Sequence, residues 1–200
     1  MSQVSKETLS RRAKIPVKMF HHHAYRTADM EATRAFYEDI LGLPLIGTFV
    51  ETTDPVTEEP SNYIHCFFEF ADGSALAFFQ FQEDKYPPSK IQGKQDPFDH
   101  HIALEVASKE EVFATKERLN AAGYDHMVID HGYCYSIYMH DPNGMQIEFT
   151  TKVPETVEIM ERHAKTAHQD LKDWLAGVTV ANNEHRKLRG APAYTPGESA

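Results

Sequence analysis

Residues 101–107 read HIALEVA, and they are followed by Ser108 and by a helix-like stretch that reaches Ala122. The same order of features occurs 79 residues earlier, where residues 22–28 read HHAYRTA and precede Asp29. Alternation of apolar and polar residues predicts a strand, and apolar residues spaced three or four apart predict a helix. A unit of this kind cannot cover its own sheet, so we expect the two copies to pack together around a shared concavity.

Each copy continues with three strand-like runs, and turn residues separate the predicted elements. Asp29 and Ser108 are placed to cap the two helices, Gly42 to end the first helix, and Asp72-Gly73 to form a hairpin turn. The expected ranges are strands over residues 17–27, 45–51, 62–70, 76–82, 101–107, 126–130, 133–139 and 145–151, and helices over residues 30–41, 109–122 and 153–175.

The predicted fold class is therefore α+β, with two tandem βαβββ modules that form a cupped mixed β-sheet and with an added C-terminal helix. We expect an N-terminal extension over residues 1–17 and a domain over residues 18–152, whose modules span about 18–84 and 98–152. A C-terminal helix and an extended or mobile tail would then occupy residues 153–200.

Composition narrows the class of protein. The 200 residues carry a net charge of −10, which disfavours binding to a phosphate backbone. Two cysteines are too few for a disulfide framework and suit a reducing compartment. Arg11-Arg12 is not followed by an apolar stretch, and no run of about 18 apolar residues occurs, so we expect a cytoplasmic protein without a membrane partner.

Strand alternation selects the candidate site residues. In the strand of the second copy, Leu104 and its apolar neighbours must face the helix, which turns His101 toward the concavity. By the internal repeat, His22 points the same way. In the last strand, Phe149 faces the helix and Glu148 points inward.

Two imidazoles and one carboxylate that converge on one point form a typical set of metal ligands. They can hold Fe(II) on one face and leave open positions for substrate and oxygen, and Zn(II) or Mn(II) could occupy the same ligands. Taken singly, each strand histidine could instead be a hydrogen-bonded structural residue, and Glu148 a solvated one. Their symmetry-related positions in the repeat favour the metal interpretation.

These features resemble the vicinal oxygen chelate superfamily, which includes glyoxalase I, fosfomycin-resistance proteins, bleomycin-binding proteins and extradiol dioxygenases. The resemblance covers residues 18–152. Within it, the segment from Ile129 to Glu148 is similar to the motif of extradiol ring-cleavage dioxygenases, because it contains Ile-Asp-His, Ile-Tyr and Asp-Pro-Asn-Gly at the spacing of that motif.

The resemblance implies roles for individual residues. His22, His101 and Glu148 match the metal ligands, Tyr138 matches a tyrosine that hydrogen-bonds the catecholate oxygen, and His131 matches a histidine near the substrate hydroxyl.

The sequence also departs from the family patterns. Extradiol enzymes usually carry another histidine about fifteen residues before the second ligand, where this chain has Tyr86, so acid–base duty would fall to His131 or His140. Glyoxalase I donates a glutamate from the strand after the Asp-Gly hairpin. The position that matches it here is Ala77, with Gln80 as the nearest polar substitute.

The leading hypothesis is an Fe(II)-dependent extradiol-type dioxygenase that acts on a catecholic aromatic substrate with O2. The alternatives are another metal-dependent enzyme of this fold, such as a lyase, isomerase or thiol transferase, and a metal-free small-molecule binding protein. Phe79 and Tyr138 are expected to line an aromatic pocket. Phe67 and Phe68 lie on opposite faces of their strand, and the sequence does not decide which of the two faces the concavity. The family and the long tail favour a homo-oligomer.

Overall fold

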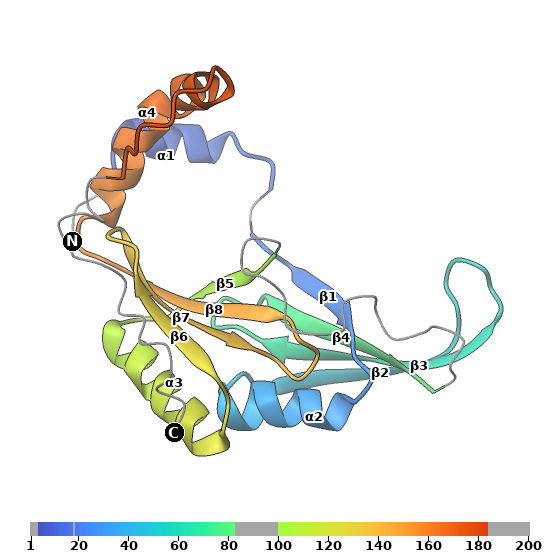
Figure 1. Ribbon diagram of the computed structural model, residues 1–200. Coiled ribbons are helices and arrows are strands. Elements are labelled where there is room, and N and C mark those ends of the chain that lie inside the picture. The colour runs from blue at the N-terminus through green and yellow to red at the C-terminus, as the bar shows by residue number, and fades with distance from the viewer. Residues whose placement is uncertain (1–3, 18, 83–99, 184–200) are drawn as a thin grey trace.

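The computed structural model describes residues 4–17, 19–82 and 100–183, and it contains two four-stranded sheets with helices against one side of them (Figure 1). Both sheets are mixed. The α+β class and the repeated βαβββ order expected from the sequence are confirmed. Tyr86 and the C-terminal tail beyond residue 183 lie outside the described residues.

The first module forms a sheet with the strand order β1-β4-β3-β2, in which β1 is parallel to β4 and the other neighbours are antiparallel. Its helix begins where Asp29 accepts a hydrogen bond from the Ala32 amide at 3.0 Å, and it ends before Gly42, whose φ is +78°. The elements are β1 (His22–Arg26), α2 (Met30–Arg34), the π-helical segment η1 (Ala35–Ile40), β2 (Leu45–Thr53), β3 (Pro60–Glu69) and β4 (Ala75–Phe81).

The second module repeats this topology with the order β5-β8-β7-β6. Its helix has the predicted bounds and ends at Gly123, with φ +75°, but the Ser108 hydroxyl makes no capping hydrogen bond to the helix. The elements are β5 (Ile102–Glu105), α3 (Lys109–Ala122), β6 (His126–Asp130), β7 (Cys134–His140) and β8 (Gln146–Lys152).

One core joins the two modules on their helix sides. Phe36 of η1 packs against Tyr124 after α3, with ring centroids 4.9 Å apart. The first strands of the modules also meet, because the ring of Tyr25 in β1 lies 6.0 Å from that of His100, just before β5. The open faces of both sheets are thereby held on the side opposite the helices.

Two further helices lie outside the repeat. The helix α1 (Lys6–Ala13) was not expected from the sequence, whereas α4 (Thr156–Leu175) is the predicted C-terminal helix and begins three residues later than expected. The two helices lie side by side, and the Ser5 amide donates to Glu161 Oε1 at 2.8 Å (Figure 1). Among the described helices, none combines the length and apolar character needed to span a bilayer.

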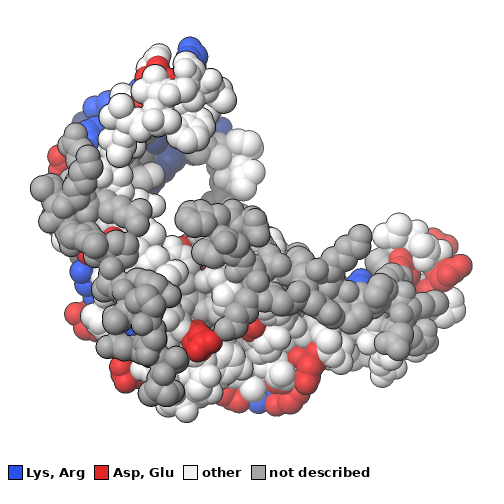
Figure 2. Space-filling model, in the orientation of Figure 1, with Lys and Arg blue, Asp and Glu red and all other residues white. Residues whose placement is uncertain are grey.

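Charge is unevenly distributed on the face drawn in Figure 2. Lys and Arg side chains gather toward the α1–α4 pair, and Asp and Glu gather at the far tip of the β2–β3 hairpin and along the lower edge. The described basic residues in this view form no continuous surface over the sheets. That nucleic acid is not a partner stays a prediction from the net charge of −10.

Candidate functional site

The open faces of the strands carry the residues that alternation predicted. Tyr25 is in the core, which places His22 on the opposite face of β1. Ile102 and Leu104 pack against the core, so that His101, just before β5, faces away from it. In β8, Phe149 is in the core and Glu148 faces the open side.

His101 and Glu148 form the centre of the candidate site. The Nε2 atom of His101 lies 3.1 Å from Oε2 of Glu148, because β5 pairs in parallel with β8 and sets Ala103 opposite Glu148. Glu148 is only 5% exposed, although it faces away from the core. A buried carboxylate needs a positive or hydrogen-bonding partner, and here it has an imidazole.

Tyr138 and His131 extend this pair into a connected group. Tyr138 lies opposite Glu148 in the β7–β8 ladder, and its ring centroid is 5.9 Å from that of His101. His131, in the turn before β7, places Nε2 at 2.9 Å from the Tyr138 hydroxyl oxygen. Burial, and then the negative charge of Glu148, raise the pKa of the Tyr138 phenol well above its ordinary value. The phenol therefore stays protonated at neutral pH and can donate a hydrogen bond.

His22 lies in a different group of side chains. Its Nδ1 is 2.7 Å from Nδ1 of His21, and its ring stands edge-on to those of Phe67 and His65 at 5.5 and 5.9 Å between centroids. Within residues 4–17, 19–82 and 100–183, the side chains form no group of three or more His, Cys, Asp or Glu placed to hold a metal ion. The structure thus brings His101 and Glu148 together, and the complete trio with His22 stays a prediction.

The donor chemistry of the His101–Glu148 pair fits a divalent metal. An imidazole nitrogen and a carboxylate oxygen converge within 3.1 Å, and these are the donor types that Fe(II), Mn(II) and Zn(II) accept. Such a cation would also balance the charge of the buried Glu148 carboxylate. The residues present therefore suit the metal that the sequence predicts, with a third protein ligand still to be supplied.

The remaining candidates lie on the two sides of the first sheet and on β7 of the second. Ala77 faces the open side, paired with Ala24 and Phe67, and offers no ligand. Gln80 does not replace it, because its Oε1 accepts from the Met30 amide at 2.8 Å on the helix side. His140, the last residue of β7, shares a strand face with Tyr138.

Sequence reasoning missed His65. Cys66 and Phe68 are in the core, which turns His65 and Phe67 of β3 to the open face. The His65 ring stacks on that of Phe79 at 3.7 Å between centroids. Its Nε2 atom is buried and has no hydrogen-bond partner among the described residues. The alternation of β3 around buried Phe68 was the signal that could have found it.

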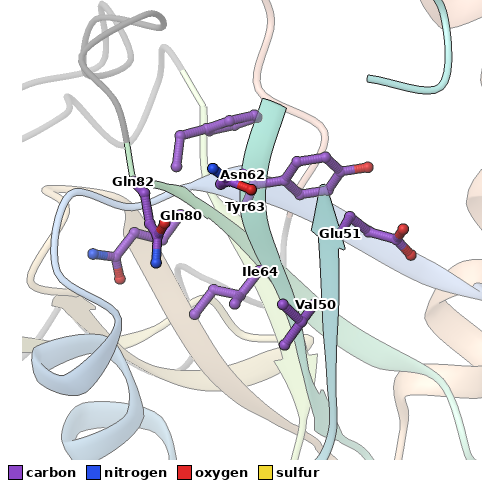
Figure 3. Close-up of a pocket in the computed structure, with 8 residues that line it drawn as sticks. Val50, Glu51, Asn62, Tyr63, Ile64, Gln80 and Gln82 are labelled. Carbon is purple, nitrogen blue, oxygen red and sulfur yellow. The ribbon is translucent and has the colours of Figure 1, made fainter. Parts of the chain in front are cut away.

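The structure also contains a pocket of about 280 Å³ that the His101–Glu148 pair does not line (Figure 3). It lies where β2, β3 and β4 run alongside one another in the first module, and Gln80 and Ile64 are among the side chains around it. Of the candidates named above, only Gln80 lines this pocket, and none of the proposed metal ligands or acid–base residues does. The lining residues are Val50, Glu51, Asn62, Tyr63, Ile64, Gln80, Phe81 and Gln82. The volume of this pocket does not by itself indicate a reaction or a ligand, so the His101–Glu148 group remains the candidate site.

Comparison with curated proteins gives two kinds of relative. The chain is 26% identical over 175 residues to a biphenyl-2,3-diol 1,2-dioxygenase of Paraburkholderia xenovorans. The matched region covers 80% of this chain and 51% of that protein. It is 27% identical over 137 residues to a lactoylglutathione lyase of Haemophilus influenzae, which covers 64% of this chain and 88% of that protein. The chain thus spans about half the length of the dioxygenase relative.

Solved structures share the fold. A fosfomycin resistance protein, FosX, from Listeria monocytogenes is 21% identical with a TM-score of 0.51, covering 72% of this chain and 99% of that chain. A glyoxylase/bleomycin resistance protein/dioxygenase domain from Frankia is 12% identical with the same TM-score, covering 68% and 99%. At such identities the likeness concerns the fold alone.

Residues 19–149 match the family described as the Glyoxalase/Bleomycin resistance protein/Dioxygenase superfamily. This range contains the His101–Glu148 pair and both βαβββ modules except the last three residues of β8, and it agrees with the resemblance drawn from the repeat. The chain belongs to this superfamily, the vicinal oxygen chelate proteins.

Proposed function

We propose that this chain is a metal-dependent dioxygenase of the extradiol type, which acts on a catecholic aromatic substrate with O2. The observation that carries the proposal is the contact of 2.9 Å between His131 Nε2 and the Tyr138 hydroxyl, beside the His101–Glu148 pair. Three of these residues, His131, Tyr138 and Glu148, come from the segment that resembles the extradiol motif, and His101 is brought to them by the β5–β8 pairing.

His101 and Glu148 would hold the metal, with His22 as the proposed third ligand. Fe(II) is the proposed metal, and Mn(II) or Zn(II) are the alternatives. When bound, the metal supplies a Lewis acid that lowers the pKa of the diol and a position beside it for O2.

Tyr138 and His131 would then handle the proton of the substrate. In the tautomer of His131 that carries its proton on Nδ1, Nε2 accepts from the Tyr138 phenol at 2.9 Å. A catechol hydroxyl that donates to the Tyr138 oxygen would then pass its proton to His131 through two hydrogen bonds. The raised pKa of the Tyr138 phenol keeps it a donor throughout. His140 is the second candidate for acid–base work, because it shares a strand face with Tyr138.

The aromatic side chains of the first module suit a flat apolar substrate. Phe67, Phe79 and His65 lie together on the open face of the sheet, next to His22. Stacking on such rings favours an aromatic ligand over a glutathione adduct. The biphenyl-diol dioxygenase relative supports the same substrate class, at 26% identity.

A lyase or isomerase is the second candidate. It is favoured by the lactoylglutathione lyase relative, of which this chain covers 88%. Ala77 weighs against it, since the position that matches the first-module glutamate of glyoxalase I has no donor atom. A thiol transferase and a metal-free binding protein are further alternatives. The following experiment separates both from a dioxygenase, because neither consumes O2 with a catechol.

The test combines metal analysis with oxygen uptake. The chain is loaded with Fe(II) without oxygen, and O2 consumption is followed with catechol and with 2,3-dihydroxybiphenyl. Iron with ring cleavage supports the proposal. Activity on a hemithioacetal with Zn(II) or Mn(II) and no O2 consumption would establish the lyase instead, and absence of bound metal would indicate a binding protein.

Variants assign the site. His101→Ala is expected to lose both metal and turnover, whereas His168→Ala, at an exposed histidine of α4, serves as the control and retains both. Full activity of His101→Ala would remove His101 from the site.

A homo-oligomer and a cytoplasmic location also stay predictions, and light scattering of the purified chain tests the first.

A further inference from the structure

The turn that carries His131 is held by residues that lie outside the superfamily domain. The family match ends at residue 149, and α4 begins at Thr156. The Thr156 hydroxyl donates to the Tyr133 carbonyl oxygen at 2.6 Å and accepts from the Val153 amide at 2.9 Å. Thr156 is 8% exposed, so the start of α4 is fixed to the β6–β7 turn.

The chain returns to the same turn after α4. Gly177, with φ +87°, ends the helix in a left-handed conformation, and the following coil runs back along α4 (Figure 1). Asn183 then donates from Nδ2 to the His131 carbonyl oxygen at 3.0 Å, across 52 residues of sequence. We call Thr156–Asn183, with its two hydrogen bonds to the turn, the C-terminal clamp.

The turn itself is short and depends on its hydrogen bonds. The His131 amide donates to the Cys134 carbonyl oxygen at 3.0 Å, and the Gly132 amide donates to Asp130 Oδ1 at 2.8 Å. Gly132 has φ +87°, a conformation that side chains disfavour. Rotation of the His131 peptide would swing its imidazole away from the Tyr138 hydroxyl, 2.9 Å away.

We infer that Asn183 is a positioning residue for His131, and that the C-terminal clamp fixes the His131 imidazole against Tyr138. The clamp acts on the backbone of His131, so it sets the direction of the side chain without touching substrate. A displacement of about 1 Å in a catalytic group can cost about a hundredfold in rate, which is why one distant hydrogen bond matters. The effect on turnover rests on the proposed function, whereas the effect on His131 does not.

The test is Asn183→Asp in the full chain. This variant keeps the shape of the side chain but replaces the donor by an acceptor that faces the His131 carbonyl oxygen. Asn182→Asp is the matched control, because it makes the same change of charge at the exposed neighbouring residue.

The first readout is independent of activity. We expect the ¹⁵N resonance of His131 Nε2 to move in Asn183→Asp toward its position in Tyr138→Phe, and the His131 amide to exchange at least tenfold faster. Asn182→Asp should change neither. An unchanged Nε2 resonance in Asn183→Asp would overturn the inference, even if the exchange rates differ.

The second readout uses turnover of the Fe(II)-loaded chain. Asn183→Asp should lower kcat at least tenfold with unchanged metal content, and its pH profile should approach that of His131→Ala. A general loss of stability would instead lower the unfolding temperature and metal content together. If the wild-type chain shows no oxygen uptake, the proposed function fails, and the resonance of His131 alone decides the role of Asn183.

Discussion

Tyr37 of the first module donates from its hydroxyl to Oδ2 of Asp141 in the second, at 2.9 Å and across 104 residues of sequence. Both side chains are buried, and Asp141 also accepts from the amides of Asn143 and Met145 at 2.8 Å. The Asp-Pro-Asn-Gly turn before β8 is thereby fixed to the helix of the other module. Because β8 carries Glu148, this contact links the packing of the two modules to the position of the site.

Removal of the Tyr37 hydroxyl should destabilise the fold. In Tyr37→Phe the buried Asp141 carboxylate loses a donor, and we expect a loss of about 1–3 kcal/mol in the free energy of unfolding. Tyr25→Phe is the matched control, since the Tyr25 hydroxyl is buried without a partner among the described residues, and its removal should be neutral or stabilising. Urea unfolding measures both, and equal losses would contradict the role of the Tyr37–Asp141 bond.

Histidines in the first module should make the metal-free protein sensitive to acid. Burial, and then the proximity of His22, lower the pKa of His65, and burial also lowers that of His23. Their folded-state pKa values lie below the unfolded value of about 6.5, so the unfolded chain takes up protons first as pH falls. Stability is therefore full above about pH 6.5 and declines below it.

The measurement is the unfolding temperature of the metal-free chain between about pH 7.5 and 5.5. His65→Phe should flatten this dependence, because it removes one such histidine and one unpartnered buried nitrogen. His168→Phe, at an exposed position of α4, should leave it unchanged. An identical pH dependence in His65→Phe and wild type would show that His65 does not titrate differently in the two states.

The two βαβββ modules were predictable from sequence because both carry the same local signals, namely apolar spacing and helix-ending glycines. Residues 109–122 and 126–130 have the predicted bounds, since Gly123 and the apolar spacing leave little freedom. The helix expected over 30–41 is present, but its second half is π-helical, a change of winding that spacing alone does not encode. The short helix α1 was missed because it is mostly polar and is paired with α4, which is distant in sequence.

The site was less predictable than the fold. Alternation placed His101 and Glu148 on one face, and the β5–β8 pairing brings them to 3.1 Å. Alternation says which way a side chain points, but not how far apart two sheets hold their strands, and so it could not place His22 relative to the other two. The contribution of His65 depends on the register of β3 against β4, which the sequence pattern left open.

His131 and Tyr138 should act as one unit in turnover. Tyr138→Phe and His131→Ala are each expected to lower kcat by about 10²–10⁴ and to leave the metal content unchanged. Because their side chains share one hydrogen bond, the double variant should lose little more than either single variant. Steady-state oxygen uptake measures all three. Additive losses would mean that the two residues serve separate steps.

His22 provides the sharpest test of the metal centre, because the structure places it beside His21 and His65 rather than beside Glu148. If it is the third ligand, His22→Ala should lower the affinity for Fe(II) at least tenfold, since one of three protein donors is lost. The matched control is His23→Ala, which removes the neighbouring imidazole on the opposite face of β1. Competition with a chelator measures the affinity, and anomalous scattering from metal-loaded crystals shows the ligands directly. Wild-type affinity in His22→Ala would leave His101 and Glu148 as the metal-binding pair and would require the third ligand to come from elsewhere in the chain or from another copy.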